Sequence, residues 1–396
     1  SRPIPDLIQI ILDLLNRQYY VRPIDVSRAG ISLLKFVPEI DQLLKNSSLE
    51  NSKQFLDQSL LAIAEAPLLL QLMSICPLAD IELEVLLTKI RSSLLSFVST
   101  ISASPKLLRF QSALALQCFT NEYLYSQTDI ETNELEAFEF LIAQTLANGQ
   151  QPTAQALLCL ASYKALHHYE WAGSLDVTPD ILEVFTRQFS EPNQEKQIKL
   201  EIPILEEIKD KISSKVRQQY EENPFPRWVN LGFPLRPVDI SKKVDELKLR
   251  LFDGAIADVK SPSILVAGCG TGQHSIGTAA TFRDSRVLAI DLSLASLAYA
   301  KRKTEKLGIQ NIDYMQADIL DLGKLERQFD IVESAGVLHH MAEPIAGWKV
   351  LTNCLKPGGL MKIGLYSELA RKNIIAMREE IRQSDMGSSD ADMKSF

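Results

Sequence analysis

A glycine-rich loop and an acidic residue downstream of it are the features best suited to bind a ligand. The loop, Gly268-Cys269-Gly270-Thr271-Gly272, follows an apolar run at 264–267 that is typical of a strand buried on both faces. Glycines at this place let the backbone turn sharply and let a ligand approach closely. Asp291 ends the next apolar run, 19 positions after Gly272. A carboxylate there can accept hydrogen bonds from both ribose hydroxyls, so the pattern predicts a nucleoside site.

The glycine spacing distinguishes between two classes of cofactor. G-x-G-x-G lacks the later glycine of the dinucleotide fingerprint, which serves a pyrophosphate at a helix amino terminus. S-adenosylmethionine has no phosphate, and its amino-acid end lies over this loop instead. The sequence therefore favours S-adenosylmethionine over NAD, and an NAD-dependent oxidoreductase is the less favoured alternative.

The elements that must position this site alternate between strand and helix. Segments that read as strands lie at 264–267, 287–290, 311–316, 329–334 and 360–365, and helical patterns separate several of them. Alternation of this kind predicts a Rossmann-like, doubly wound parallel sheet, whose ligand lies at the carboxyl ends of the strands. The segment Leu355–Gly359 is expected to be a turn before the fifth strand.

Residues 261–367 resemble the class I S-adenosylmethionine-dependent methyltransferases. GCGTG, Asp291, the segment QAD and the segment LKPGG occur in the order of that family. The resemblance implies that Asp318 bonds the adenine amine and that Ile319 flanks the ring. The cofactor-binding residues that it implies are Gly268, Cys269, Gly270, Gly272, Asp291, Leu292, Asp318, Ile319, Ala335 and Gly336.

The end of the chain departs from the family pattern. The family sheet has seven strands, whereas here the fifth strand is followed by a predicted helix at 368–381 and a polar tail. We therefore expect a sheet without its last two strands, and a chain that is truncated or whose end is unseen.

Three side chains are candidates for a direct role in catalysis. His339 and His340 follow the fourth strand, over the expected position of the methyl group, and either could take a proton from the acceptor. The alternative is that one packs on the cofactor or caps the loop while the other faces solvent. Tyr220 could bond the cofactor carboxylate or the acceptor, and a plain structural hydrogen bond is the alternative. His274 is expected to orient the helix after the glycine loop.

The first half of the chain has a different pattern. Only three of the 17 glycines lie in residues 1–200, and apolar residues recur there at helical spacing. About seven helices are expected, two of them at 26–45 and 51–74, in a bundle or an irregular helical repeat. The predicted domains are a helical domain at 1–173, a linker or lid at 174–238, and the methyltransferase domain at 239–396.

Two segments add a narrower resemblance. QCFTNEYLY (117–125) and RQQYEENPFPRW (217–228) are similar to segments of bacterial proteins that join a helical, tetratricopeptide-like region to this fold. The stretch 220–237 is dense in proline and aromatic residues, so we expect neither regular helix nor central strand there. An ordered linker and a lid over the cofactor remain equal alternatives for it.

The charge and cysteine content of the chain limit the classes of partner and the location that we expect. Residues 1–200 carry 15 Lys and Arg against 23 Asp and Glu, and this acidic balance argues against a nucleic-acid partner. The five scattered cysteines predict reduced thiols without a metal site, and no apolar stretch suits a membrane span, so a cytoplasmic location is expected.

The predicted function is transfer of a methyl group to a protein or small-molecule acceptor, with the helical domain recognising a substrate or partner protein. The alternative is a catalytically inactive, cofactor-binding scaffold.

Overall fold

The computed structural model of the protein describes residues 4–17, 19–46, 53–232, 236–384, 386, 387 and 392. Its internal contacts divide the chain into two compact units. The helical unit comprises residues 1–193, 228–232 and 387–396, and the sheet unit comprises residues 194–227 and 233–386. The predicted fold class, an all-α region followed by a Rossmann-like parallel sheet, is confirmed. The predicted division at residues 173 and 238 stays a prediction.

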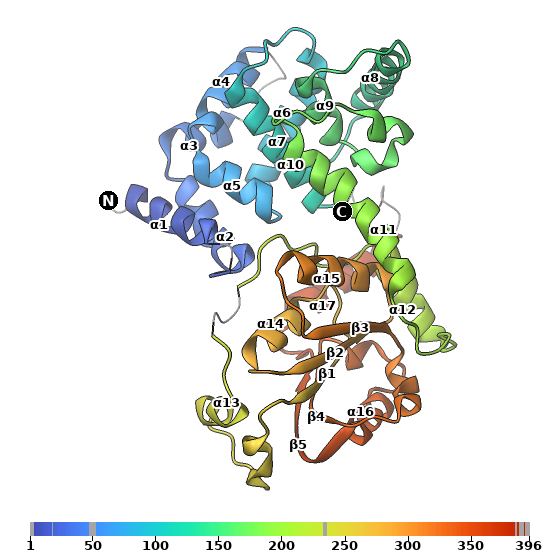
Figure 1. Ribbon diagram of the computed structural model, residues 1–396. Coiled ribbons are helices and arrows are strands. Elements are labelled where there is room, and N and C mark those ends of the chain that lie inside the picture. Colours follow the sequence, from blue (N-terminus) through green and yellow to red (C-terminus); the bar gives the residue numbers. More distant parts are fainter. Residues whose placement is uncertain are drawn as a thin grey trace. The chain divides into compact units, whose positions relative to one another are not determined.

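Successive helices make up the helical unit (Figure 1). Its α-helices are α1 (Ile4–Asn16), α2 (Pro23–Leu34), α3 (Pro38–Asn46), α4 (Lys53–Ala64), α5 (Pro67–Ile75), α6 (Ile81–Phe97), α7 (Pro105–Thr120), α8 (Asp129–Ala147), α9 (Ala154–Ala161) and α10 (Leu182–Phe185). Shorter turns are η1 (Leu166–His168), η2 (Glu170–Ser174) and η3 (Thr186–Ser190). Helix α11 (Glu191–Glu201) begins in this unit and ends in the sheet unit.

Two of the predicted helical segments are each two helices. The segment 26–45 contains the end of α2 and most of α3, and the segment 51–74 contains α4 and most of α5. Pro38 and Pro67 each stand at the start of the second helix of the pair. Proline has no amide hydrogen to donate but fits the first turn of a helix, so it ends one helix and begins the next.

The core of the helical unit centres on α5. Leu68, Leu69 and Leu72 have no exposed surface, and each such burial stabilises the fold by about 1.5–3 kcal/mol. Arg91 and Glu131, both nearly fully buried, pair at 3.4 Å between α6 and α8.

Across the described residues no single helix has the length and apolar character to cross a membrane, although α4 and α5, bent by 90°, pass that test as a pair.

The sheet unit contains five parallel strands among its described residues. They are β1 (Ser263–Ala267), β2 (Arg286–Asp291), β3 (Ile312–Gln316), β4 (Phe329–Ala335) and β5 (Leu355–Gly364), in the spatial order β3-β2-β1-β4-β5. Its helices and helical turns are α12 (Lys211–Glu222), α13 (Ile240–Glu246), η4 (Gly254–Asp258), α14 (Gln273–Thr281), α15 (Leu294–Lys306), η5 (Ile319–Leu325), η6 (Leu338–His340), α16 (Pro344–Asn353) and α17 (Lys372–Gln383).

Alternate residues of the central strand enter two separate cores. Ile264 and Val266 of β1 pack in one cluster with residues of α14 and α15, such as Ala279 and Leu297. Leu265 and Ala267 pack in the other cluster with residues of η5 and α16, such as Leu322 and Leu351. The sheet is therefore covered on both faces (Figure 1), and its central strands β1 and β2 contain continuous apolar runs.

The fifth strand begins earlier than expected. The segment Leu355–Gly359, predicted as a turn, is the first half of β5. Phe329 pairs with Leu355 and Ile331 pairs with Leu360, so the partner strand β5 contains extra residues at this point. Such a bulge keeps a Pro-Gly-Gly segment in the strand although its residues do not fit a regular ladder.

Candidate functional site

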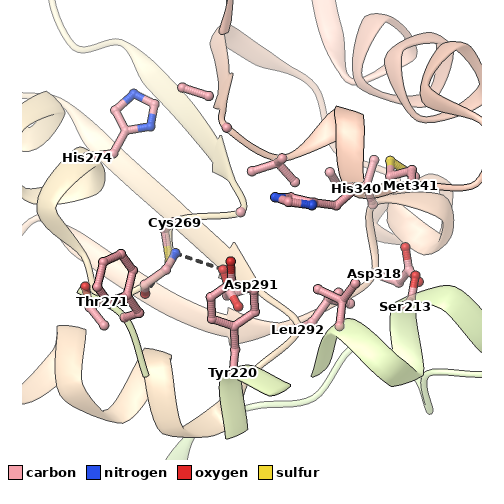
Figure 2. A pocket seen from close by; sticks show the side chains of 18 of the residues that line it. Ser213, Tyr220, Cys269, Thr271, His274, Asp291, Leu292, Asp318, His340 and Met341 are labelled. Atoms are coloured by element: carbon pink, nitrogen blue, oxygen red, sulfur yellow. Dashed lines mark hydrogen bonds between the residues drawn. The ribbon is translucent and has the colours of Figure 1, made fainter. Parts of the chain in front are cut away.

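A cavity of about 330 Å³ lies at the carboxyl ends of the strands of the sheet unit (Figure 2). Its wall contains residues that follow β1, β2, β3, β4 and β5, as well as residues of α12 and the segment after it. A parallel sheet binds its ligands at this edge, where the strand order reverses between β1 and β4. The volume is within the range of small-molecule sites.

The glycine loop forms the floor of the cavity, and two of its positions accept only glycine. Gly268 has φ +76°, and a Cβ atom there would lie 2.3 Å from Cγ2 of Val337. Gly272 has φ +91° and forms the amino-terminal cap of α14, and a Cβ atom there would lie 2.7 Å from Cβ of Ala300. The turn from β1 into α14 therefore depends on these glycines.

Asp291 is fixed at the carboxyl end of β2. The backbone N–H of Gly270 donates to its Oδ2 at 2.8 Å, and the backbone N–H of Ser293 donates to its Oδ1 at 3.0 Å. Burial raises the pKa of the Asp291 carboxyl, although these backbone hydrogen bonds act in the opposite direction. Each oxygen keeps a further acceptor site, so the carboxylate can accept hydrogen bonds from a diol.

Asp318 and Ile319 lie where the chain leaves β3. The Asp318 carboxylate, which is almost fully buried, accepts a hydrogen bond at 3.0 Å from the backbone N–H of Leu320 and caps η5. Ile319 is buried beside it, and both line the cavity. An acid beside an apolar side chain suits a heterocycle with an exocyclic amine.

The end of α12 and the residues after it make up one wall of the cavity. Tyr220, Phe225 and Pro226 line this wall, and Oγ1 of Thr271 donates to the carbonyl oxygen of Pro226 at 2.8 Å. Thus the segment 220–226 is joined directly to the glycine loop. The sequence expectation of no regular helix after residue 220 is wrong for its first part, because α12 continues to Glu222. Burial raises the pKa of the Tyr220 phenol, and the nearby Tyr366 and Asp291 act in the same direction.

Glu221 fixes this wall from the outside. Its Oε2 accepts hydrogen bonds from the backbone N–H of Ala295 at 3.0 Å and from Oγ of Ser293 at 3.1 Å. Lys199 pairs with its other oxygen at 2.8 Å. Burial raises the pKa of Glu221, but Lys199 and the start of α15 outweigh burial and the pKa is lowered. A carboxylate at a helix amino terminus is favoured by the dipole of the helix.

The two histidines after β4 have different positions. His340 lines the cavity, whereas His339 does not and stacks on Tyr366 with ring centroids 3.8 Å apart. The two Nε2 atoms lie 3.1 Å apart. Burial lowers the pKa of both imidazoles, and the positive charge of Arg371 adds to this effect. Neutral rings are therefore favoured at this side of the cavity.

Most residues predicted to form the site lie on the cavity wall. All predicted cofactor-binding residues except Gly272 line it, and of the three catalytic candidates Tyr220 and His340 line it. The residues on the wall that the sequence interpretation did not assign to the site include Ser213, Val216, Met341 and Tyr366. Tyr366 could have been found from its place just beyond the fifth strand. Ser213 and Val216 could not, because nothing in the sequence indicates that α12 returns to the sheet.

The cavity fits S-adenosylmethionine. Asp291 ends β2 and Asp318 follows the neighbouring strand β3, so both acids lie at the same edge of the sheet, where a ribose and its base can be bound together. The open glycine loop lies beside them, and the buried Nδ1 atom of His274 has no hydrogen-bond partner among the described residues. These features leave room for an amino-acid group next to the nucleoside.

Residues 264–359 match a protein family described as a methyltransferase domain. An uncharacterized protein of Synechococcus is 35% identical over 129 residues, which are 32% of this chain and 31% of that protein. The ubiquinone biosynthesis O-methyltransferase of Acinetobacter baumannii is 26% identical over 134 residues, which are 34% of this chain and 54% of the relative. The solved structure of PKMT2 from Rickettsia typhi in complex with AdoHcy is 21% identical and has a TM-score of 0.31, and the match covers 40% of this chain and 31% of the other.

The chain thus spans about half of one of these relatives and less than a third of the other two proteins. The family match covers residues 264–359 of the sheet unit, which include the glycine loop, Asp291 and Asp318. The match to a methyltransferase domain lies within the sheet unit, and the cavity there is the site for S-adenosylmethionine as cofactor.

Proposed function

We propose that the protein transfers the methyl group of S-adenosylmethionine to a protein or a small molecule, and that the helical unit contributes to recognition of the acceptor or a partner protein. The observation that carries this proposal is the placement of Asp291 and Asp318 after adjacent strands, on the wall of one cavity with the glycine loop. The bound cofactor supplies a methyl group that its sulfonium already activates.

The residues of the chain then have to bind the cofactor, orient it toward the acceptor and exclude water from the cavity. Asp291 would accept hydrogen bonds from the ribose hydroxyls, and Asp318 would accept one from the adenine amine. Phe225 and Pro226 would keep water from the nucleoside, because their segment is joined to the glycine loop through Thr271. Leu292, Ala335 and Gly336 would line the path of the cofactor.

His340 is the better placed of the two histidines to take a proton from the acceptor. It lines the cavity and its pKa is lowered, so its neutral form is available as a base near neutral pH. His339 would instead hold the ring of Tyr366 in place. We also propose that Tyr220 contacts the cofactor or the acceptor, since it shares the wall with Asp291.

Binding and transfer can be tested separately with the full chain. Calorimetric titration should show binding of S-adenosylmethionine and S-adenosylhomocysteine and no binding of NAD. Transfer of a radiolabelled methyl group into lysate fractions, with and without protease treatment, should then distinguish a protein from a small-molecule acceptor. Binding without any transfer would favour a cofactor-binding scaffold, and absence of binding would reject the proposal.

A further inference from the structure

We propose that Arg371, stacked on Tyr366 beside the cavity, binds a carboxylate of the methyl acceptor. The proposal rests on the proposed function, because it assigns a chemical class to the acceptor of the same site. The acceptor is then a carboxylic acid, or a peptide that presents such a group, and the atom that receives the methyl group lies elsewhere in it.

Tyr366 joins Arg371 to the cavity wall. It follows the end of β5 by two residues and lines the cavity. A Cβ atom at Gly336 would lie 3.9 Å from its phenol oxygen, so this oxygen is close to the loop after β4. Cζ of Arg371 lies 3.8 Å from the centre of the Tyr366 ring, and the ring of His339 lies at the same distance. The guanidinium is therefore one ring away from the path expected for the cofactor.

The stacked guanidinium keeps its N–H groups for a ligand. Stacking uses the flat face of the group, whereas its N–H groups point outward in the plane and suit the two oxygens of a carboxylate. Among the described residues no carboxylate pairs with the Arg371 side chain. Glu368, three positions earlier, offers its backbone carbonyl to the backbone N–H of Arg371 at 3.2 Å. Because arginine stays charged in proteins, Arg371 presents a positive group that an acid can bind.

A second arginine adds positive charge on the same side of the cavity. Arg378 follows Arg371 by seven positions, about two helical turns, so the two side chains share one face of α17. Burial lowers the pKa of His340, and the charges of Arg371 and then Arg378 lower it further. The ring of His340 points into the cavity (Figure 2). An anionic acceptor is therefore attracted to the side on which His340 could take its proton.

The wall around His340 also suits an apolar body for this acid. Val337 and Met341 line the cavity on either side of the short turn that contains His340, and Tyr366 adds an aromatic ring. These side chains can contact a ring or a chain while Arg371 contacts the charged end. Benzoate, an aromatic ring with one carboxylate, is a simple probe of this arrangement, and benzamide has nearly the same shape without the charge.

The two probes are titrated by ligand-observed NMR against the full chain saturated with S-adenosylhomocysteine. Wild-type protein should bind benzoate about 10-fold more tightly than benzamide, the lower end for a hydrogen bond to a charged group, because Arg371 is partly open to solvent. In histidine-labelled protein, benzoate should also move the signals of His340, which places the probe in the cavity.

Three variants distinguish a contact with Arg371 from a general effect of charge. Arg371→Gln removes the charge, so its affinities for benzoate and benzamide should become equal. Arg371→Lys keeps the charge without the planar fork and should keep part of the preference for benzoate. Arg382→Gln is the matched control at the other end of α17, because Arg382 pairs with Glu379, and it should keep the full preference. Binding of S-adenosylhomocysteine, measured first for each variant, shows that the site is folded.

A wild-type protein without preference for benzoate, or an Arg371→Gln variant that keeps this preference, would overturn the proposal. The same holds if Arg382→Gln loses the preference equally, or if benzoate leaves the signals of His340 in place, because the anion then lies outside the cavity. If wild-type protein binds no S-adenosylhomocysteine, the proposed function itself fails, so the two failures are distinguishable.

Discussion

The backbone N–H of Gly270 donates a hydrogen bond at 2.8 Å to Oδ2 of Asp291, and this bond joins the loop after β1 to the acid at the end of β2. The two motifs that the sequence presents 21 residues apart are therefore one unit of structure. The same carboxylate also accepts from the backbone of Ser293, ahead of α15. Asp291 thus positions the loop in addition to any contact that it makes with a ribose.

Replacement of Asp291 should weaken cofactor binding strongly. Asp291→Ala removes the acceptor of the ribose hydroxyls and the anchor of the Gly270 N–H, so we expect an affinity for S-adenosylhomocysteine that is lower by about 10- to 100-fold. Isothermal titration calorimetry measures this directly. The control is Asp313→Asn, an exposed acid on β3 of the same sheet, which should bind normally. Equal affinities of the Asp291→Ala variant and the wild type would contradict the assignment of the ribose acid.

Glu221 should determine how long the cofactor stays bound. In Glu221→Gln the amide nitrogen replaces one of the carboxylate oxygens that accept from Ala295 and from Lys199. The end of α12 then loses part of its attachment, and the cavity wall next to it opens more often. We expect S-adenosylhomocysteine to dissociate several-fold faster, by roughly the effect of one hydrogen bond.

Surface plasmon resonance on immobilised protein gives this dissociation rate. The neighbouring Glu222→Gln is the matched control, since Glu222 is exposed and accepts a hydrogen bond from Gln218 in the same helix. Equal rates in the two variants would show that Glu221 does not hold the wall.

The central strands and Asp291 were predictable because their positions follow from local patterns. A parallel strand buried on both faces is a continuous apolar run, and its carboxyl end is where a ligand binds, so Asp291 could be found from the strand that it ends. Asp318 was found instead through the resemblance of the QAD segment to the methyltransferases. The extra residues of β5 could not be predicted, because Pro357 and Gly358 are typical of turns and only the pairing with β4 keeps them in the strand. Nε2 of His274 lies 2.9 Å from Oε2 of Glu333, and no local pattern in the sequence indicates this contact between residues 59 positions apart.

The imidazole of His340 should titrate below its ordinary range. Burial and then the charge of Arg371 lower its pKa from 6.5, because both disfavour the imidazolium form. Arg371→Gln should move the titration midpoint of His340 upward, as measured by NMR on histidine-labelled protein. Arg382→Gln is the control, since Arg382 lies near the end of α17, whose start Arg371 caps, and it pairs with Glu379. A midpoint that is the same in both variants would contradict a direct effect of Arg371.

The lowered pKa of His340 also makes the free energy of unfolding depend on pH. A histidine whose pKa is lower in the folded state than in the unfolded state binds its proton more readily when unfolded. The contribution of His340 is therefore present above about pH 6.5, the ordinary pKa of histidine, and is lost as the pH falls through its lower folded pKa. In Arg371→Gln, the free energy of unfolding should depend less steeply on pH in this range.

Two glycines of the same region should respond to alanine in opposite directions. Gly272 has φ +91° and its Cβ atom would lie 2.7 Å from Cβ of Ala300, so Gly272→Ala should lower the free energy of unfolding of the sheet unit by about 1–3 kcal/mol. Gly277 lies within α14, and a Cβ atom there would meet nothing within 4 Å. Gly277→Ala should therefore stabilise the unit by about 0.5–1 kcal/mol, the difference in helix propensity. Urea denaturation followed by circular dichroism measures both, and destabilisation by Gly277→Ala would show that α14 cannot accept a side chain on that face.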